Sequence, residues 1–359
     1  MTEAGGSALI AEPDISGELR VRAYGSGDER RWDSFVERCS SATFFHRAGW
    51  RDILENIFHH RCHYLLAERN GDVCGILPLA EMKSRLFGHA LVSLPFCVYG
   101  GPAASDATAE RALIDAATEL ARNLRATHLE LRNRTVKCPG WPQQDLYVTF
   151  RKPIEVDCDA NLLAIPRKQR AMVRKGIARG LRSEIDSTPE RFFELYADNV
   201  HRHGTPPLAK RYFARLMETF AGNCEVLTVC ASDGEPVSAV MSFYFKSEVL
   251  PYYAGDTESA RELAANDFKY WEVLRRACER GSKVFDYGRS KRGSGSYAFK
   301  KNWGFEPAPL AYEYALLARH TVPQNNPANP SFSALISIWR RMPRSVVNAL
   351  GPIIVRNLG

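Results

Sequence analysis

The chain has 359 residues, of which 45% are hydrophobic and 25% are charged, so it can fill more than one core and about two domains are expected. This composition excludes fibrous and disordered proteins. No stretch approaches the roughly 18 to 20 uninterrupted apolar residues of a membrane span. The first eighteen residues carry acids instead of the basic start of a secretion signal, namely Glu3, Glu12, Asp14 and Glu18. We therefore expect a globular protein of the cytoplasm.

The formal net charge of +7 is concentrated toward the C-terminal end. No acidic residue follows Glu313, whereas five arginines do: Arg319, Arg340, Arg341, Arg344 and Arg356. The rest of the chain keeps 7 minus 5, or +2, which is nearly balanced. Wholesale binding of nucleic acid is therefore not indicated.

The nine cysteines are scattered singly, without a C-x-x-C pair, and several lie in apolar strand patterns such as residues 73–77. We expect them to be buried free thiols. One crowded segment contains His59, His60, Cys62 and His63. Because no second pair of ligands lies at a familiar spacing, this segment is interpreted as the entry to a strand, and no metal is expected.

Residues 1–18 are expected to be disordered, and regular structure begins after them. The first half then predicts a helical region, a hairpin around Asn70-Gly71, a strand, a helix and a short strand. These elements are expected at 31–58, 62–68 with 73–79, around Leu94-Pro95-Phe96, 108–125 and 128–133.

The second half repeats this order. Its elements are expected at 189–220, 224–230 with 237–243 around Asp233-Gly234, around Leu250-Pro251-Tyr252, 266–280 and 283–288. The prolines of the two Leu-Pro strands, Pro95 and Pro251, lie 251 minus 95, or 156, positions apart. The acids of the two final strands, Glu130 and Asp286, lie 286 minus 130, again 156, positions apart. The shared displacement indicates a duplicated domain.

A hairpin followed by a strand, a helix and a parallel strand is the order of the GNAT acyltransferase fold. There, two central strands splay apart and the acyl donor enters the gap. We therefore predict an α/β (α+β) protein of two tandem GNAT-like modules, at 19–150 and 151–318. A linker at 319–330 and a basic amphipathic tail at 331–359 are expected to follow.

Several segments carry a family resemblance, most specifically residues 285–291 (FDYGRSK) and 297–305 (YAFKKNWGF), with 165–170, 204–206 and 263–268 in support. Over most of residues 19–318 the chain resembles the FemAB family of tandem-GNAT transferases, in particular the branch associated with exosortase and PEP-CTERM exopolysaccharide systems. The resemblance implies transfer of an acyl or aminoacyl group to an amine or hydroxyl of a cell-envelope precursor or related saccharide.

The donor is expected to be an activated acyl group and no bound cofactor. GNAT enzymes that use acetyl-CoA usually carry a glycine-rich loop whose N–H groups cradle the pyrophosphate. Neither half has it, and the acids of residues 255–258 (GDTE) would repel a pyrophosphate. Acetyl-CoA is therefore disfavoured, and aminoacyl-tRNA or another acyl donor fits better.

The chemistry is expected in the second module, because acyl transfer needs a proton acceptor and positive charge for the oxyanion. Phe299-Lys300 matches the Phe-Lys pair that lies at the transfer centre of FemAB-type enzymes, so Lys300 is expected to stabilise the oxyanion and Phe299 to shape the pocket. Asp286 and Asp267 are candidate proton acceptors, although Asp267 also fits a helix N-cap. The candidate substrate-binding residues are Tyr252, Tyr253, Arg289, Ser290, Lys291, Lys301, Arg167 and Arg170.

Two basic segments complete the sequence predictions. Residues 167–182 carry seven cations and no acid, with Val173, Ile177 and Leu181 as a packing stripe, so contact with tRNA or with a nucleotide or lipid pyrophosphate is expected there. The tail could contact a membrane, the body or a partner.

Two alternatives to the leading function remain open. One is a CoA-dependent N-acyltransferase. The other is a non-catalytic GNAT-fold protein that binds an exopolysaccharide assembly complex through the basic helix and the tail.

Overall fold

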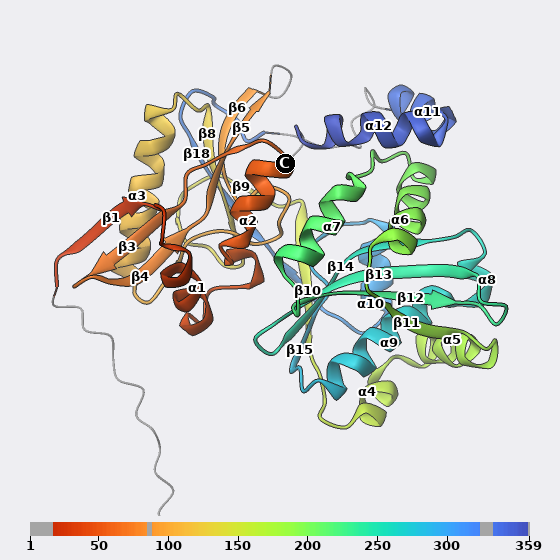
Figure 1. Cartoon of the computed structure of the whole chain (residues 1–359). Coiled ribbons are helices and arrows are strands. Elements are labelled where there is room, and N and C mark those ends of the chain that lie inside the picture. The colour runs from red at the N-terminus through yellow and green to blue at the C-terminus, as the bar shows by residue number, and fades with distance from the viewer. Residues whose placement is uncertain (1–16, 85–87, 324–332, 358–359) are drawn as a thin grey trace, which may run out of the picture.

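The computed structural model describes residues 17–84, 88–323 and 333–357. Two halves lie side by side, and each consists of strands covered by helices (Figure 1). The expectation for residues 1–18 falls, apart from residues 17 and 18, outside the described residues.

The first half follows the predicted order. Its elements are β1 (Leu19–Ala23), α1 (Glu29–Arg38), η1 (Phe44–His46), α2 (Gly49–Asp52), η2 (Ile53–Ile57), β2 (Arg61–Cys62), β3 (Leu65–Arg69), β4 (Asp72–Leu77), β5 (Leu79–Ser84), β6 (Gly88–Ser93), β7 (Ala103–Ala104), α3 (Ala107–Asn123), β8 (His128–Asn133) and β9 (Gln143–Gln144). The hairpin turn has positive φ at Asn70 (52°) and Gly71 (86°), which Asn-Gly tolerates and which matches the twist of the two strands.

The second half repeats the order with longer strands. Its elements are β10 (Tyr147–Pro153), α4 (Cys158–Ala164), α5 (Arg167–Ala178), β11 (Arg182–Asp186), α6 (Glu190–Arg202), α7 (Lys210–Thr219), β12 (Cys224–Cys230), β13 (Pro236–Phe245), β14 (Glu248–Asp256), α8 (Ala260–Leu263), α9 (Ala265–Glu279), β15 (Val284–Asp286), β16 (Ser290–Lys291), α10 (Gly295–Asn302), β17 (Pro307–Pro309) and β18 (Ala311–Leu316). Helices α6 and α9 both pack on β13 and β14, and Figure 1 shows them on opposite sides of this sheet.

The two halves exchange a strand, which the sequence did not predict. The six-stranded sheet of the first half has the order β2-β5-β6-β8-β18-β9, and the large sheet of the second half has the order β11-β12-β13-β14-β15-β10-β16. Strand β18 thus pairs with β8 although it follows the second half in the chain, and β10 pairs with β15 although it precedes that half. The predicted boundary at residue 150 falls inside β10, and β18 lies within the range 151–318 but in the sheet of the first half.

A buried carboxylate fixes β18 in its foreign sheet. Glu313 is fully buried and accepts hydrogen bonds from Asn133 Nδ2 at 2.6 Å and from the backbone N–H groups of Lys137 at 2.9 Å and Cys138 at 2.8 Å. Asn133 is the last residue of β8, and Lys137 and Cys138 belong to the segment that follows it. A buried charge needs such partners, so this register of β18 is strongly specified.

Strands β14 and β15 splay apart, as the predicted fold requires. Their parallel pairing is confined to Glu248 with Val284 and Val249 with Phe285, while β14 continues to Asp256 paired only with β13. A bulge leaves Tyr252 without a partner on β13. The Tyr252 hydroxyl donates to the carbonyl of Phe96 at 3.1 Å, so a loop of the first half reaches the splayed strand.

The tail forms two helices, α11 (Ser333–Arg341) and α12 (Arg344–Val355), which dock on the body. Trp339 and Val347 are buried, Gly351 lies against Pro207, and the ring of His201 lies 3.1 Å from the carbonyl of Trp339. Figure 1 shows both helices above α6. Of the three expectations for the tail, docking on the body is the one observed. No helix within the described ranges is long and apolar enough to cross a bilayer.

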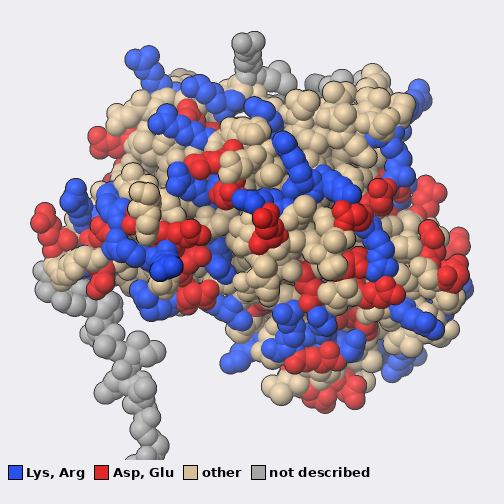
Figure 2. Space-filling view, viewed as in Figure 1, with Lys and Arg blue, Asp and Glu red and all other residues tan. Residues whose placement is uncertain are grey.

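The surface of the body carries charges of both signs. Figure 2 shows lysines and arginines interspersed with aspartates and glutamates over most of the face in view. This pattern agrees with the nearly balanced charge before residue 314.

Candidate active site

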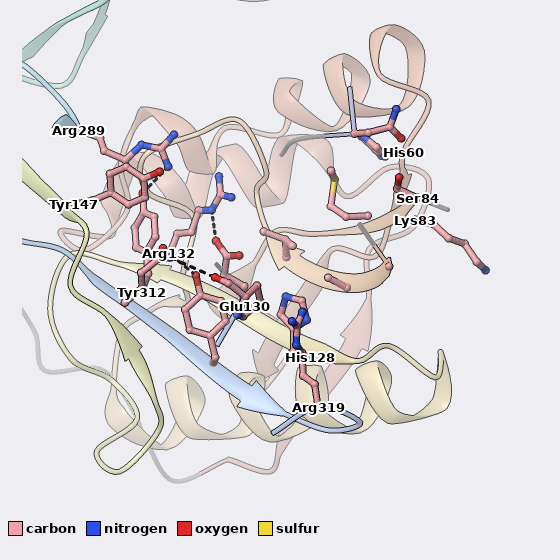
Figure 3. A pocket seen from close by; sticks show the side chains of 18 residues that line it. His60, Lys83, Ser84, His128, Glu130, Arg132, Tyr147, Arg289, Tyr312 and Arg319 are labelled. Carbon is pink, nitrogen blue, oxygen red and sulfur yellow. Dashed lines mark hydrogen bonds and ion pairs between the residues drawn. The ribbon is translucent and has the colours of Figure 1, made fainter. Parts of the chain in front are cut away.

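A cavity of about 110 Å³ lies on the six-stranded sheet of the first half, where the second half meets it (Figure 3). Strand β8 supplies His128, Glu130 and Arg132, which share one face of the strand because side chains alternate. The exchanged strands add Tyr147 from β10 and Tyr312 from β18. Both halves are therefore needed to build this cavity.

Arg289 is the predicted site residue that lines this cavity. Its guanidinium lies 4.6 Å from the ring centre of Tyr147 and 5.9 Å from that of Tyr312, and Nη1 lies 3.4 Å from the Tyr312 hydroxyl. Figure 3 shows the three side chains together at one end of the cavity. No carboxylate of the described residues lies within ion-pair distance of Arg289. A guanidinium held between aromatic rings and left without a carboxylate is suited to bind an anionic group.

The charged lining is mostly positive. Among the described residues, Arg132, Arg289 and Arg319 line the cavity against the single acid Glu130, while Lys83 lies at its rim, where it pairs with Glu81 at 3.5 Å. Arg132 and Glu130 neutralise each other through a 2.7 Å ion pair. Arg289 and Arg319 have no carboxylate within ion-pair distance in the described part of the chain, so they favour a phosphate or carboxylate group on a molecule that binds here.

His128 presents an acceptor nitrogen to this cavity. The hydroxyl of Thr127 donates to the carbonyl of His89 at 2.8 Å, so it can only accept from His128 Nδ1 at 3.0 Å. The proton therefore sits on Nδ1 and Nε2 keeps its lone pair. Burial lowers the pKa of His128, which keeps the ring neutral at pH 7.

Asp286 lies in the joint between the halves and does not line the cavity. It is fully buried, and it accepts hydrogen bonds from Arg151 Nη1 at 2.9 Å, the Tyr99 hydroxyl at 3.0 Å and the Gly288 N–H at 2.7 Å. Burial raises the pKa of this carboxyl, and Arg151 opposes the rise. With Arg151 on β10 and Tyr99 in the first half, Asp286 ties three segments together.

Lys300 is buried and also does not line the cavity. Its ammonium donates to the carbonyls of Tyr287 at 2.7 Å, Gly288 at 3.3 Å and Arg289 at 3.3 Å. Burial lowers its pKa to about 7, with Asp286 opposing the shift. Its three donors are thus directed to the loop that carries Arg289, which makes Lys300 a positioning residue for that guanidinium.

Asp267 and Phe299 occupy a separate apolar cluster. Asp267 accepts from the indole N–H of Trp303 at 2.9 Å, and burial raises its pKa. The alternative that Asp267 caps the helix is wrong, because the N-cap of α9 is Ala264 and Asp267 lies inside the first turn. Phe299 packs against Tyr270 and Trp303, with ring centres 5.5 and 6.0 Å apart.

The two predicted tyrosines belong to an aromatic cluster. The hydroxyl of Tyr253 lies 2.8 Å from that of Tyr212, and the ring of Tyr252 lies 5.1 Å from Phe45 of the first half. Their hydroxyls are thus engaged within the protein, and neither residue lines the cavity. The remaining predicted residues do not line the cavity either: Ser290, Lys291, Lys301, Arg167 and Arg170.

The basic helix α5 presents its cations to solvent. Arg167, Lys168, Arg174 and Lys175 are exposed, and no carboxylate of the described residues pairs with them. The predicted stripe is partly wrong, because Val173 is buried but Ile177 is 51% exposed. Gly176 takes the packing position instead, since an added Cβ would lie 2.8 Å from that of Phe268 on α9. Contact with phosphate stays a prediction.

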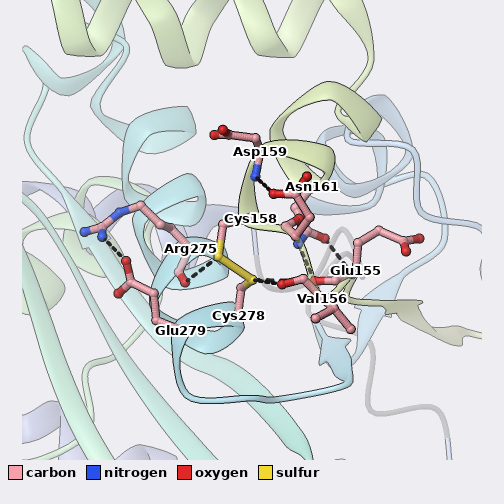
Figure 4. Close-up of a disulfide and its surroundings, with 9 residues drawn as sticks. Glu155, Val156, Cys158, Asp159, Asn161, Arg275, Cys278 and Glu279 are labelled. Carbon is pink, nitrogen blue, oxygen red and sulfur yellow. Dashed lines mark hydrogen bonds and ion pairs between the residues drawn. A yellow bond between two sulfur atoms is a disulfide. The ribbon is translucent and has the colours of Figure 1, made fainter.

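Cys158 and Cys278 form a disulfide that joins α4 to α9 (Figure 4). The expectation of nine free thiols is wrong for this pair, because residues 120 positions apart cannot be matched from spacing alone. The other seven cysteines are free. The crowded His59–His63 segment forms no cluster of three metal-ligating side chains, and neither does any other part of the described chain.

The cavity residues outside the predicted set include the five that shape its central part: His128, Glu130, Arg132, Tyr147 and Tyr312. Alternate polar residues at 128, 130 and 132 were a usable signal, because a strand that buries one such face must provide partners for it. The duplication already matched Glu130 with Asp286. No signal in the sequence placed Tyr147 and Tyr312 beside Arg289, since only the strand exchange brings them there.

Comparison with known proteins identifies the fold. Residues 167–301 match the family described as "Acetyltransferase (GNAT) domain". The structure is similar to that of FemX, with 16% sequence identity over 83% of this chain and 98% of that one and a TM-score of 0.67. It is also similar to L-PGS from Bacillus licheniformis (13% identity, 88% and 98% of the chains, TM-score 0.56). A tandem GNAT protein from the clavulanic acid biosynthesis pathway gives 14% identity over 85% and 100% of the chains and a TM-score of 0.51.

No curated protein matches this chain in sequence. The structural matches confirm the predicted α/β fold of two GNAT-like modules. At these identities the likeness concerns the fold.

The burial of Lys300 predicts a pH dependence of stability. The pKa of Lys300 in the folded chain is about 7. Above pH 7 the folded chain has therefore lost this proton, whereas the unfolded chain still binds it. The free energy of unfolding should therefore rise by about 2 kcal/mol from pH 7 to pH 9 relative to Lys300→Met. Urea unfolding at several pH values measures this. The exposed neighbour provides the control, because Lys301→Met should keep the wild-type slope, and equal slopes for all three proteins would refute the assignment.

The disulfide predicts the number of reactive thiols. Alkylation of the denatured, unreduced protein should modify seven of the nine cysteines, and reduction should expose the other two. Peptide mass spectrometry should identify those two as Cys158 and Cys278. In addition, Cys158→Ser should lower the free energy of unfolding by about 2 to 4 kcal/mol under oxidising conditions and change it little under reducing ones.

Proposed function

We propose that this protein transfers an acyl or aminoacyl group to an amine or hydroxyl of an anionic acceptor, in a cavity shared by its two GNAT modules. The observation that carries the proposal is Arg289, which has no carboxylate partner and is held between tyrosines of both exchanged strands. The acceptor class that fits is a phosphorylated or carboxylated precursor of the cell envelope or of an exopolysaccharide. The sequence resemblance to the exopolysaccharide branch supports that class.

Arg289, Lys300 and His128 have distinct roles in the proposed reaction. Arg289 binds the anionic group of the acceptor, and Lys300 holds the loop that carries Arg289 in place. His128 Nε2 accepts the proton that the acceptor amine or hydroxyl loses as its lone pair attacks the acyl carbon. The proton then passes to the leaving group of the donor as the tetrahedral intermediate collapses.

The donor is proposed to be an activated acyl or aminoacyl ester, and aminoacyl-tRNA fits the exposed cations of α5. A thioester such as acetyl-CoA is the second candidate, because the expected repulsion between the acids of residues 255–258 and its pyrophosphate is weakened. Lys269 Nζ lies 2.7 Å from Asp256 Oδ1, so the charge of that acid is already offset in the 255–258 loop. Release of a free thiol would favour the thioester, whereas consumption of charged tRNA would favour the ester.

The experiment that tests the proposal supplies the purified protein with each donor and a mixture of envelope and exopolysaccharide precursors. Mass spectrometry then detects an acceptor whose mass has grown by one acyl or aminoacyl group. If the protein binds such acceptors but modifies none with either donor, the non-catalytic alternative replaces this proposal.

Substitution of Arg289 should weaken acceptor binding. We expect Arg289→Met to raise KM for the acceptor about tenfold to hundredfold and to change kcat less, because a bound anion loses its charged partner. Arg292→Met is the matched control, since Arg292 is exposed and pairs with Asp145 at 3.0 Å on the surface. Equal KM values for wild type and Arg289→Met would remove Arg289 from acceptor binding.

Substitution of His128 should instead lower kcat. A base whose pKa lies below its ordinary value is active once deprotonated, so kcat should rise with pH through a pKa below about 6.5 and then level off. His128→Gln should lose this acidic limb and reduce kcat about 100-fold or more. His89→Gln is the control, because His89 pairs with Glu81 and does not line the cavity. An unchanged pH profile in His128→Gln would exclude His128 as the base.

A further inference from the structure

The outer face of the tail exposes a row of large apolar side chains. Val346, Leu350, Ile353 and Ile354 on α12 are 40%, 42%, 60% and 38% exposed, and Ile338 on α11 is 54% exposed. The spacing of three and four residues puts the α12 members on one side of the helix. They make up half of the ten large hydrophobic side chains exposed on the described chain, although the tail supplies only 25 of its residues.

Packing on the body does not explain this row. The buried side of α12 is formed by Val347 and Gly351, and Gly351 lies against Pro207. Ile353 borders a hollow between α12 and the body but is still 60% exposed. The exposed large hydrophobic side chains of the body are instead dispersed over different elements; examples are Leu163 on α4 and Ile185 on β11. A row of exposed apolar residues on one helix indicates a binding surface, whereas single exposed ones need no explanation.

The charges beside the row have one sign. The tail carries Arg340, Arg341, Arg344 and Arg356 and no acid, whereas the body mixes both signs. Arg341 and Arg356 have no carboxylate within ion-pair distance among the described residues. Figure 2 shows an uncharged surface over the tail helices, with basic side chains at its margins.

We propose that this face, defined by Ile338, Val346, Leu350, Ile353 and Ile354, binds the surface of an anionic lipid bilayer. An apolar helix face beside arginines can insert into the boundary between headgroups and acyl chains. Arginines near that surface gain from the negative potential of the lipid headgroups. A convex row without acids suits a flat anionic surface better than a protein partner, which would have to offer a matching groove.

When this face of the tail binds the bilayer, the cavity between the two halves would lie close to the lipid. The carbonyl of Arg356, at the end of α12, lies 2.8 Å from the His60 ring, and both His60 and Asn357 line the cavity. Membrane binding by this face does not depend on the proposed transferase activity, so the two can be tested separately.

Cosedimentation of the full chain with vesicles tests the proposal. We expect binding to equimolar phosphatidylcholine and phosphatidylglycerol, weakening with salt, and at least about tenfold less binding to phosphatidylcholine alone. Leu350→Asp combined with Ile353→Asp should lower binding to the anionic vesicles about tenfold or more. Leu163→Asp is the matched control, because Leu163 is 63% exposed on α4, on the side of the molecule away from the tail.

A second variant tests the charges without touching the apolar row. Arg341→Glu combined with Arg356→Glu should also lower binding to the anionic vesicles, while thermal unfolding stays close to that of the wild type. Unchanged binding by both double variants, or equal binding to both kinds of vesicle, would overturn the proposal. A shift from dimer to monomer in sedimentation velocity for the apolar variant would also overturn it, because the face would then bind a second copy of the chain.

Discussion

The reciprocal exchange of β10 and β18 is the constraint on which the rest of the structure depends. A sheet edge leaves N–H and C=O groups unpaired, and here each half covers such an edge with a strand from the other. Buried carboxylates fix both exchanges, Glu313 on β18 and Asp286 beside β10. Because each needs donors from a different part of the chain, neither half can complete its sheet alone. Each of these two sheets is therefore complete only when both halves are in place.

The same exchange builds the cavity. Arg289 belongs to the loop after β15, but the rings that hold it come from β10 and β18. Below that loop, Lys300 binds three carbonyls and Asp286 binds the Gly288 N–H. The backbone at 287–289 is thus fixed from two sides, which positions one guanidinium at the boundary of the halves. Such fixed placement is what binding an anion with a single side chain requires.

Much of the fold could be predicted from the sequence, because most of its helices and turns have recognisable local sequence patterns. The Asn70-Gly71 turn and the amphipathic helix now seen as α3 have local signatures, and their repetition in the second half revealed the duplication. The exchange and the disulfide have no local signature, since each joins segments more than a hundred residues apart. For that reason the sequence pointed to the second module for the chemistry, whereas the cavity lies on the sheet of the first half. Residues such as Lys300 and Asp267 combine charge with aromatic neighbours, and a sequence cannot tell whether such a group faces solvent, substrate or a carbonyl.

Glu130 and Asp286, the two acids that the sequence offset matches, have different surroundings in the two modules. Glu130 and Asp286 each follow the long helix of their half, and each pairs with an arginine, Arg132 at 2.7 Å and Arg151 at 2.9 Å. Arg132 lies on the same strand as its acid, so that pair leaves the sheet face open and forms a cavity wall. Arg151 arrives on the exchanged strand, and the approach of that strand buries Asp286 completely. The carboxylate at the joint is therefore enclosed by its hydrogen-bond partners, whereas Glu130, which the sequence offset matches with it, lines the cavity on the sheet of the first half.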